Sequence, residues 1–127
     1  MGKAPLARAR QVMADLTSKD PVVLKVGAVG NVDEGVELHL VLKNRGKCQV
    51  TAFSGVAYGY DAYGKAVQMN EGGEHYVAFA EEKVEDLKPG ELHTHAVLLK
   101  HVETASLALA QVDQVKCADG TAWSRPL

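Results

Sequence analysis

The chain has 127 residues, 46% of them hydrophobic and 24% charged, which is enough for one globular domain with a core of its own. Its formal net charge is −2, from 14 basic and 16 acidic residues, and no basic run is dense enough to follow a phosphate backbone, so we expect no nucleic-acid partner. No segment approaches the roughly 18 apolar residues of a membrane-spanning helix, and residues 1–20 lack the apolar stretch of a signal peptide. We therefore expect either a cytosolic protein or one whose leader has been removed.

The first 20 residues predict a short amphipathic helix. Between positions 5 and 17, apolar side chains recur on one side at helical spacing: Leu6, Ala9, Met13 and Leu16. Pro5 suits a first helical turn, and Asp20-Pro21 indicates the end of the helix. This segment, residues 1–20, either flanks the sheet or acts as a tether or self-association element outside the main domain, residues 21–127.

The clearest strand pattern lies in residues 36–43. Here Val36, Leu38, Leu40 and Leu42 alternate with mainly polar residues, which is the period of a strand with one buried face. Before it, residues 22–26 read as a strand, and Gly27 to Gly35 as a turn rich in Gly, Asn and Asp.

A third, long strand is expected over residues 48–60. Its alternate residues from Val50 to Tyr60 share one side, and Gly55 and Gly59 lie on the other. Because glycine weakens a strand interior, these two predict a bulge, a bend or a close approach of another backbone or a ligand.

The second half of the chain repeats this pattern. We expect strands over residues 75–80, 91–100 and 105–117, with a bulge in the last between Ala110 and Gln114, where the alternation breaks. Asp119-Gly120 then predicts a hairpin that returns residues 121–123 along that strand. About seven short strands separated by turn residues predict an all-β fold: an antiparallel two-sheet immunoglobulin-like sandwich with a short N-terminal helix.

Three runs resemble parts of the FxLYD-type immunoglobulin-like domains of bacterial envelope proteins. They are Leu-Val-Leu-Lys-Asn-Arg-Gly at 40–46, Tyr-Asp-Ala-Tyr-Gly-Lys-Ala-Val at 60–67 and Leu-Lys-Pro-Gly-Glu at 87–91. Within the family signature itself only Tyr60-Asp61 agrees, since Ala57 and Gly59 stand where Phe and Leu are expected. The ending at 115–123 is similar to the closing hairpin of other uncharacterised bacterial sandwiches. The resemblance, which covers about residues 35–123, implies a sandwich fold and an exported or periplasmic location rather than a cytoplasmic one, and it implies no activity.

The two cysteines, Cys48 and Cys117, lie 69 positions apart on expected strands. They either meet across the core as a disulfide, which would stabilise the fold by about 4 kcal/mol in an oxidising compartment, or stay separate buried thiols. No Cys-x-x-Cys or adjacent His activates either thiol, so we do not expect redox or nucleophilic chemistry.

Histidines supply a candidate metal site. Glu91, His93 and His95 lie at i, i+2 and i+4 of an expected strand and so project to one face, where they would offer three ligands to zinc or copper. A fourth ligand would come from His75, His101 or His39. The alternative is that His93 and His95 are surface residues and that the protein needs no cofactor.

Three tyrosines cluster at the end of the third strand. Tyr58, Tyr60 and Tyr63 form a candidate interaction patch, or else Tyr58 and Tyr60 belong to the core and Tyr63 to a turn.

The sequence favours a non-catalytic accessory or protein-interaction module that binds a partner protein or a second copy of itself. It contains no Gly-x-Ser-x-Gly elbow and no phosphate-binding loop, and we predict that it is not an enzyme. A metal-binding sandwich using His93 and His95 is the second hypothesis, and a small hydrolase or transferase with an unrecognised site is the third.

Overall fold

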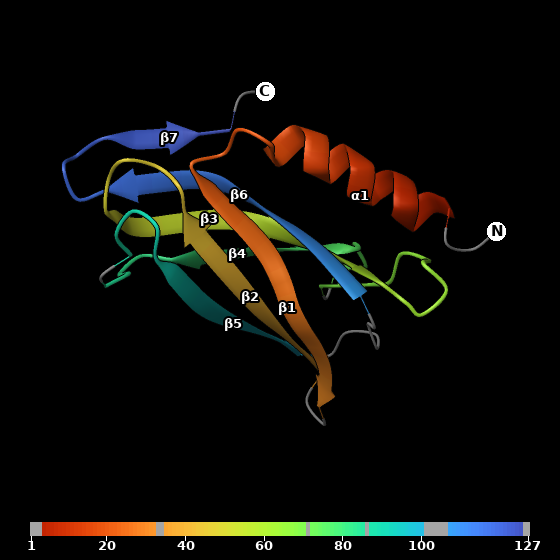
Figure 1. Cartoon of the computed structure of the whole chain (residues 1–127). Helices are drawn as coiled ribbons and strands as arrows, with labels where there is room; N and C mark the ends of the chain where they lie inside the picture. The colour runs from red at the N-terminus through yellow and green to blue at the C-terminus, as the bar shows by residue number, and fades with distance from the viewer. Residues whose placement is uncertain (1–3, 33–34, 71, 86, 101–106, 126–127) are drawn as a thin grey trace.

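A computed structural model of the chain describes residues 4–32, 35–70, 72–85, 87–100 and 107–125. Helix α1 (Ala4–Thr17) precedes seven strands: β1 (Val22–Val32), β2 (Gly35–Asn44), β3 (Val50–Tyr60), β4 (Tyr76–Glu81), β5 (Leu92–Lys100), β6 (Leu107–Cys117) and β7 (Ala122–Ser124). The strands form two antiparallel sheets, β1-β2-β5 and β4-β3-β6-β7, which stack face to face (Figure 1). The predicted all-β, two-sheet sandwich with a short N-terminal helix is confirmed.

The core lies between the two sheets and is built on β2. Burial alternates along this strand as predicted, and its four inward side chains are no more than 1% exposed: Val36, Leu38, Leu40 and Leu42. They belong to one apolar cluster with side chains of β3 and β6, among them Phe53, Ala57, Val112 and Val115. Each fully buried leucine or valine contributes about 1.5–3 kcal/mol, so this seam supplies much of the stability.

Strand β1 is longer than the sequence indicated. The predicted turn at 27–35 is wrong for residues 27–32, because β1 continues to Val32 past a bulge at Gly27. A Cβ atom on Gly27 would lie 3.2 Å from Val41 Cγ2, so the missing side chain lets the bulge fit closely against β2. Pairing then resumes at Ala28, and Val29 packs against the core. Residues 33–34 of the predicted turn lie outside the described residues.

The glycines of β3 mark close approaches, as predicted. A Cβ atom on Gly55 would overlap the backbone carbonyl of Gln111 in β6, and one on Gly59 would overlap the side chain of Met69. Pairing between β3 and β6 shifts next to Gly55, which leaves Asp113 as the extra residue. The predicted bulge between Ala110 and Gln114 is therefore confirmed.

A second bulge changes which residues of β3 face inward. Pairing also shifts between Val50 and Ala52, so Val50 and Phe53 are both buried although they differ in strand phase. From Phe53 onward the inward positions are the odd-numbered ones, including Ala57, and Tyr58 points to the outer face, toward α1. The simple alternation expected from Val50 to Tyr60 is wrong for this reason.

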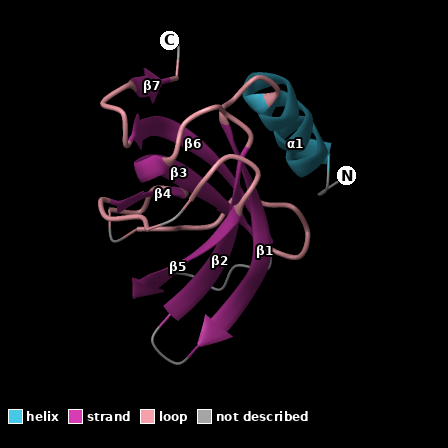
Figure 2. Cartoon of the chain, turned by 60° about the vertical axis from the view of Figure 1, so that its left-hand side comes forward, coloured by secondary structure: helices cyan, strands magenta, loops and turns pink. Residues whose placement is uncertain are grey.

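Helix α1 lies along the outer side of the four-stranded sheet, next to β6 (Figure 2). Its C-terminal carbonyl groups are bound by Arg45, whose guanidinium donates to the oxygens of Thr17 at 3.0 Å and Ser18 at 2.7 Å. A cation at this end also opposes the partial negative charge of the helix dipole. In this structure the segment flanks the sheet, the first of the two interpretations of residues 1–20.

A buried ion pair joins the end of the helix to the end of the chain. Arg125 donates to both carboxylate oxygens of Asp20, at 3.0 and 2.6 Å, and to Asp113 at 3.2 Å. Burial alone would lower the pKa of Arg125, but the hydrogen bonds and charges of the two aspartates outweigh it and raise that pKa above its ordinary value. Because a buried pair is costly to break, it holds the helix end and β7 in place.

Replacing Gly55 with alanine is expected to lower the free energy of unfolding by about 3 kcal/mol, since the added methyl group must displace the backbone of β6. Gly30→Ala in β1 is the matched control, because a Cβ atom there meets no heavy atom within 4 Å, and it should change stability by less than about 0.5 kcal/mol. Urea unfolding followed by circular dichroism compares the two. Equal stability of both variants would contradict the close approach at Gly55.

Candidate functional site

The outer face of the three-stranded sheet is uncovered by any described element (Figure 1). Strand pairing aligns its outward side chains in rows across β1, β2 and β5. One row is Val23, Lys43 and Leu92, and the next is Lys25, Val41 and Thr94. Leu92 and Leu98 on β5 are 67% and 42% exposed, so this face presents apolar side chains directly to solvent.

These rows border a cavity of about 530 Å³, which we call the basic groove. Its apolar walls are Val23, Val41 and Leu92, and the absence of a side chain at Gly27 leaves room in its floor. Its cations are Lys25, Lys43 and Arg45, and no acidic residue is among its described lining residues. Arg45 is engaged at the helix terminus, so the two exposed lysines set the local charge.

Strand β5 ends its sheet, so the groove adjoins a free edge. β5 pairs only with β2 among the described strands, and half of its backbone N–H and C=O groups therefore point away from the sheet. Such an edge can pair with an extended segment of another chain. Leu92 belongs to both the groove and this edge.

The two histidines predicted as metal ligands face the inside of the sandwich. On β5, His93 pairs opposite Leu42 and His95 opposite Leu40, so both share a face with the core. Their ring centroids lie 6.0 and 5.5 Å from that of Phe53 in the opposite sheet. The alternative that His93 and His95 are surface residues is wrong, because their side chains are only 23% and 18% exposed.

The carboxylate that joins these histidines is Glu81, not Glu91. Glu81 Oε2 lies 2.8 Å from His93 Nε2 and 3.0 Å from His95 Nδ1, which links the edge strands β4 and β5 of the two sheets. Glu91 instead accepts the backbone N–H of Lys88 at 3.0 Å. The sequence did not indicate Glu81 as a partner, because this residue lies on the opposite sheet, 14 positions before His95. The available signal was that Glu81 directly follows the strand expected over residues 75–80.

Two of the three candidate fourth ligands, His39 and His75, are not at this cluster. His39 pairs with Glu37 on the outer face of β2 at 2.6 Å, and the ring of His75 lies 5.4 Å from that of Tyr58. His101 lies outside the described residues. Within the described ranges, no group of three or more His, Cys, Asp or Glu side chains is arranged to hold a metal ion, so the zinc or copper hypothesis gains no support here.

The three tyrosines of the predicted patch are divided between two places. Tyr63 is 76% exposed in the turn after β3, and Tyr60 is buried at 8% exposure. Tyr58 and Tyr60 line a crevice beneath α1, together with His75. Burial, and then the neighbouring Tyr58, raise the pKa of Tyr60. The prediction that these three tyrosines form a single exposed patch is therefore wrong.

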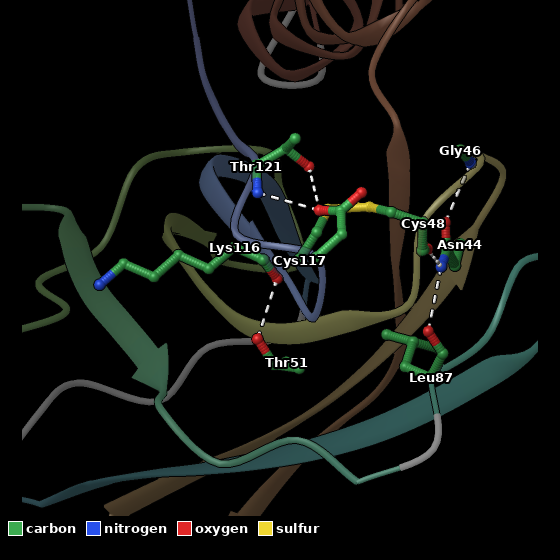
Figure 3. The surroundings of a disulfide bond; sticks show 9 residues. Asn44, Gly46, Cys48, Thr51, Leu87, Lys116, Cys117 and Thr121 are labelled. Atoms are coloured by element: carbon green, nitrogen blue, oxygen red, sulfur yellow. Dashed lines mark hydrogen bonds between the residues drawn. A yellow bond between two sulfur atoms is a disulfide. The ribbon is translucent and has the colours of Figure 1, made fainter.

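Cys48 and Cys117 form a disulfide, with their Cα atoms 5.8 Å apart (Figure 3). It joins the turn before β3 to the end of β6. Beside it, the buried Asn44 donates to the carbonyl oxygens of Cys48 at 2.7 Å and Leu87 at 3.0 Å (Figure 3). The disulfide is the first of the two alternatives left open for these cysteines, and such bonds are typical of oxidising compartments.

Comparisons with known proteins define the class of fold. No family model matches the chain, and a search of curated proteins finds no match. A crystal structure of a hypothetical protein from Peptoclostridium difficile 630 is similar, with a TM-score of 0.61 and 12% sequence identity over 82% of this chain and 86% of that one. At this identity the likeness shows the fold alone, that of a two-sheet antiparallel β-sandwich. In the part of the chain that the structure describes, no helix has the length and apolar character to cross a membrane.

Glu81→Ala is expected to lower the free energy of unfolding by about 1–2 kcal/mol, because two half-buried imidazoles lose their partner. Glu82→Ala, at the exposed neighbouring position, should change it by less than about 0.5 kcal/mol. Urea unfolding measures both, and the NMR signals of His93 and His95 should move only in Glu81→Ala. Unmoved signals in that variant would show that Glu81 does not bind His93 and His95.

Removing the disulfide by the double change Cys48→Ala and Cys117→Ala should lower the free energy of unfolding by roughly 3–4 kcal/mol, through greater freedom of the unfolded chain. The same loss should follow when the parent protein is reduced with dithiothreitol, which leaves the double variant unaffected. A parent protein whose unfolding curve does not respond to dithiothreitol would be inconsistent with the bond.

Proposed function

We propose that this protein is a non-catalytic β-sandwich binding module that uses the basic groove to bind an extended acidic segment of a partner protein. The observation that carries the proposal is the composition of the groove. The apolar side chains of Val23, Val41 and Leu92 alternate across the strands with two exposed lysines, and no described element covers them.

The shape of this surface fits an extended segment better than a folded ligand. The outward side chains repeat along each strand from one row to the next, and Leu92 lies where the groove meets the free edge of β5. A segment paired with the edge of β5 would place an outward apolar side chain beside Leu92, while the edge offers it backbone hydrogen bonds. Every second side chain of an extended chain points the same way, so a segment whose same-facing positions are apolar and acidic by turns suits both features.

Charge supports an acidic partner. The protein as a whole carries a net charge of −2, yet Lys25 and Lys43 make this one region positive. Local charge of this kind steers an oppositely charged partner and discriminates against a basic one. The acid nearest to the groove in sequence, Glu91, is held to the Lys88 backbone.

We extend the proposal to an exported or periplasmic location. The Cys48–Cys117 disulfide supports an oxidising compartment. Membership of the envelope immunoglobulin-like domains stays a prediction that rests on the sequence resemblance.

A fluorescently labelled peptide of Val-Thr-Glu-Thr repeats, which when extended presents Val and Glu by turns on one face, tests the groove directly by fluorescence anisotropy. Lys43→Glu should weaken binding about tenfold, equivalent to ~1.4 kcal/mol, through charge repulsion, and Leu92→Ala should weaken it through lost apolar contact. Lys83→Glu, the same charge change at an exposed lysine outside the groove, should leave binding unchanged.

A second peptide with Lys in place of Glu should bind at least tenfold more weakly to the parent protein. Equal binding of the two peptides, or equal effects of Lys43→Glu and Lys83→Glu, would overturn the proposal.

A further inference from the structure

A second cavity lies on the other side of the molecule, between α1 and the outer face of β3 and β6. This crevice has a volume of about 390 Å³, within the range of about 300–1,000 Å³ in which small-molecule sites fall. Its apolar walls come from both elements: Val12, Met13 and Leu16 from the helix and Leu109 from β6.

The helix does not close over these walls. Val12 and Leu16 line the crevice yet are 57% and 51% exposed, whereas the inward side chains of β2 are almost wholly buried. The described contacts that fasten α1 are at its C-terminal end, where Arg45 and Arg125 bind backbone oxygens from Leu16 to Asp20. The rest of the helix therefore spans the sheet and leaves apolar surface that a ligand can cover.

Polar groups from several elements also line the crevice, among them the amide of Gln111 on β6. The rings of Tyr58 and Tyr60 lie 5.4 and 6.3 Å from the ring of His75, and Arg8 lines the crevice from the helix. Phenol, imidazole and amide groups can each donate a hydrogen bond, and the guanidinium group of Arg8 is the positively charged one among the described lining residues. No acidic residue is among the described lining residues, so the crevice complements an anion.

We infer that this crevice binds a small amphiphilic carboxylate, with its apolar body between α1 and β6 and its carboxylate beside Arg8, Tyr58 and His75. Few polar groups converging at an apolar pocket fix the orientation of such ligands. The inference is independent of the basic groove, which lies on the opposite sheet.

Decanoate is a suitable probe, and isothermal titration calorimetry with the full chain measures its binding. Decanoate should bind saturably, and decyltrimethylammonium, which has the same chain and the opposite charge, should bind at least tenfold more weakly. The NMR signals of the Met13 methyl group and the Tyr58 ring should move during the decanoate titration.

Two matched pairs of variants locate the site. Arg8→Gln should weaken decanoate binding about fivefold, whereas Arg10→Gln, an exposed arginine on the same helix but outside the crevice, should not. Val12→Glu should weaken it at least tenfold through charge repulsion, whereas Ala14→Glu on the exposed part of the helix should have little effect. Because Val12 is more than half exposed, the new carboxylate does not have to be buried, and circular dichroism checks that the helix remains.

Absence of saturable decanoate binding would overturn the inference, as would equal effects within either pair of variants. Lys43→Glu should leave decanoate binding unchanged, so failure at one surface is distinguishable from failure at the other.

Discussion

The contact between the inward face of β2 and the inner face of the β3-β6 pair is the interaction on which the rest of the structure depends. Four aliphatic side chains of β2 are removed almost completely from water, and their partners come from the opposite sheet. The two glycines of β3 allow this sheet to form, because β6 and Met69 occupy the space that side chains would fill. With the inner faces committed to each other, the outer faces and the edges are the parts of the two described sheets that stay accessible.

Where one face of a strand is clearly more apolar than the other, the sequence was sufficient to predict the strand and its buried face. Val36 to Leu42 specify a half-buried strand by themselves, and the break in alternation after Ala110 marks the bulge at Asp113. The fold class followed from such strands and from the turn residues between them. The sequence-based prediction was wrong at Gly27, because a glycine followed by Asn and Asp residues is typical of a turn. Only the contact with the neighbouring Val41 shows that Gly27 forms a bulge within a paired strand.

The candidate sites were harder to predict because their residues meet across the fold. Cys48 and Cys117 were recognisable as a pair since there are only two cysteines, but nothing local showed that they meet. Glu91 appeared to complete a ligand set because it is near His93 in sequence, whereas the fold supplies Glu81 from the other sheet. The lysines of the basic groove were overlooked because they lie on different strands and gather only when β1 pairs with β2.

Glu81 also decides which side of β5 is presented to solvent. The outward positions of this strand hold Leu92, Thr94, Ala96 and Leu98, and the inward positions hold His93, His95, Val97 and Leu99. A slip of one residue would exchange the two sets, and because the outward set is at least as apolar, hydrophobic burial alone does not choose between them. The hydrogen bonds to both imidazoles exist in only one alignment. A single carboxylate on the facing sheet thus favours the arrangement in which Leu92 and Leu98 remain on the outer face of the sandwich.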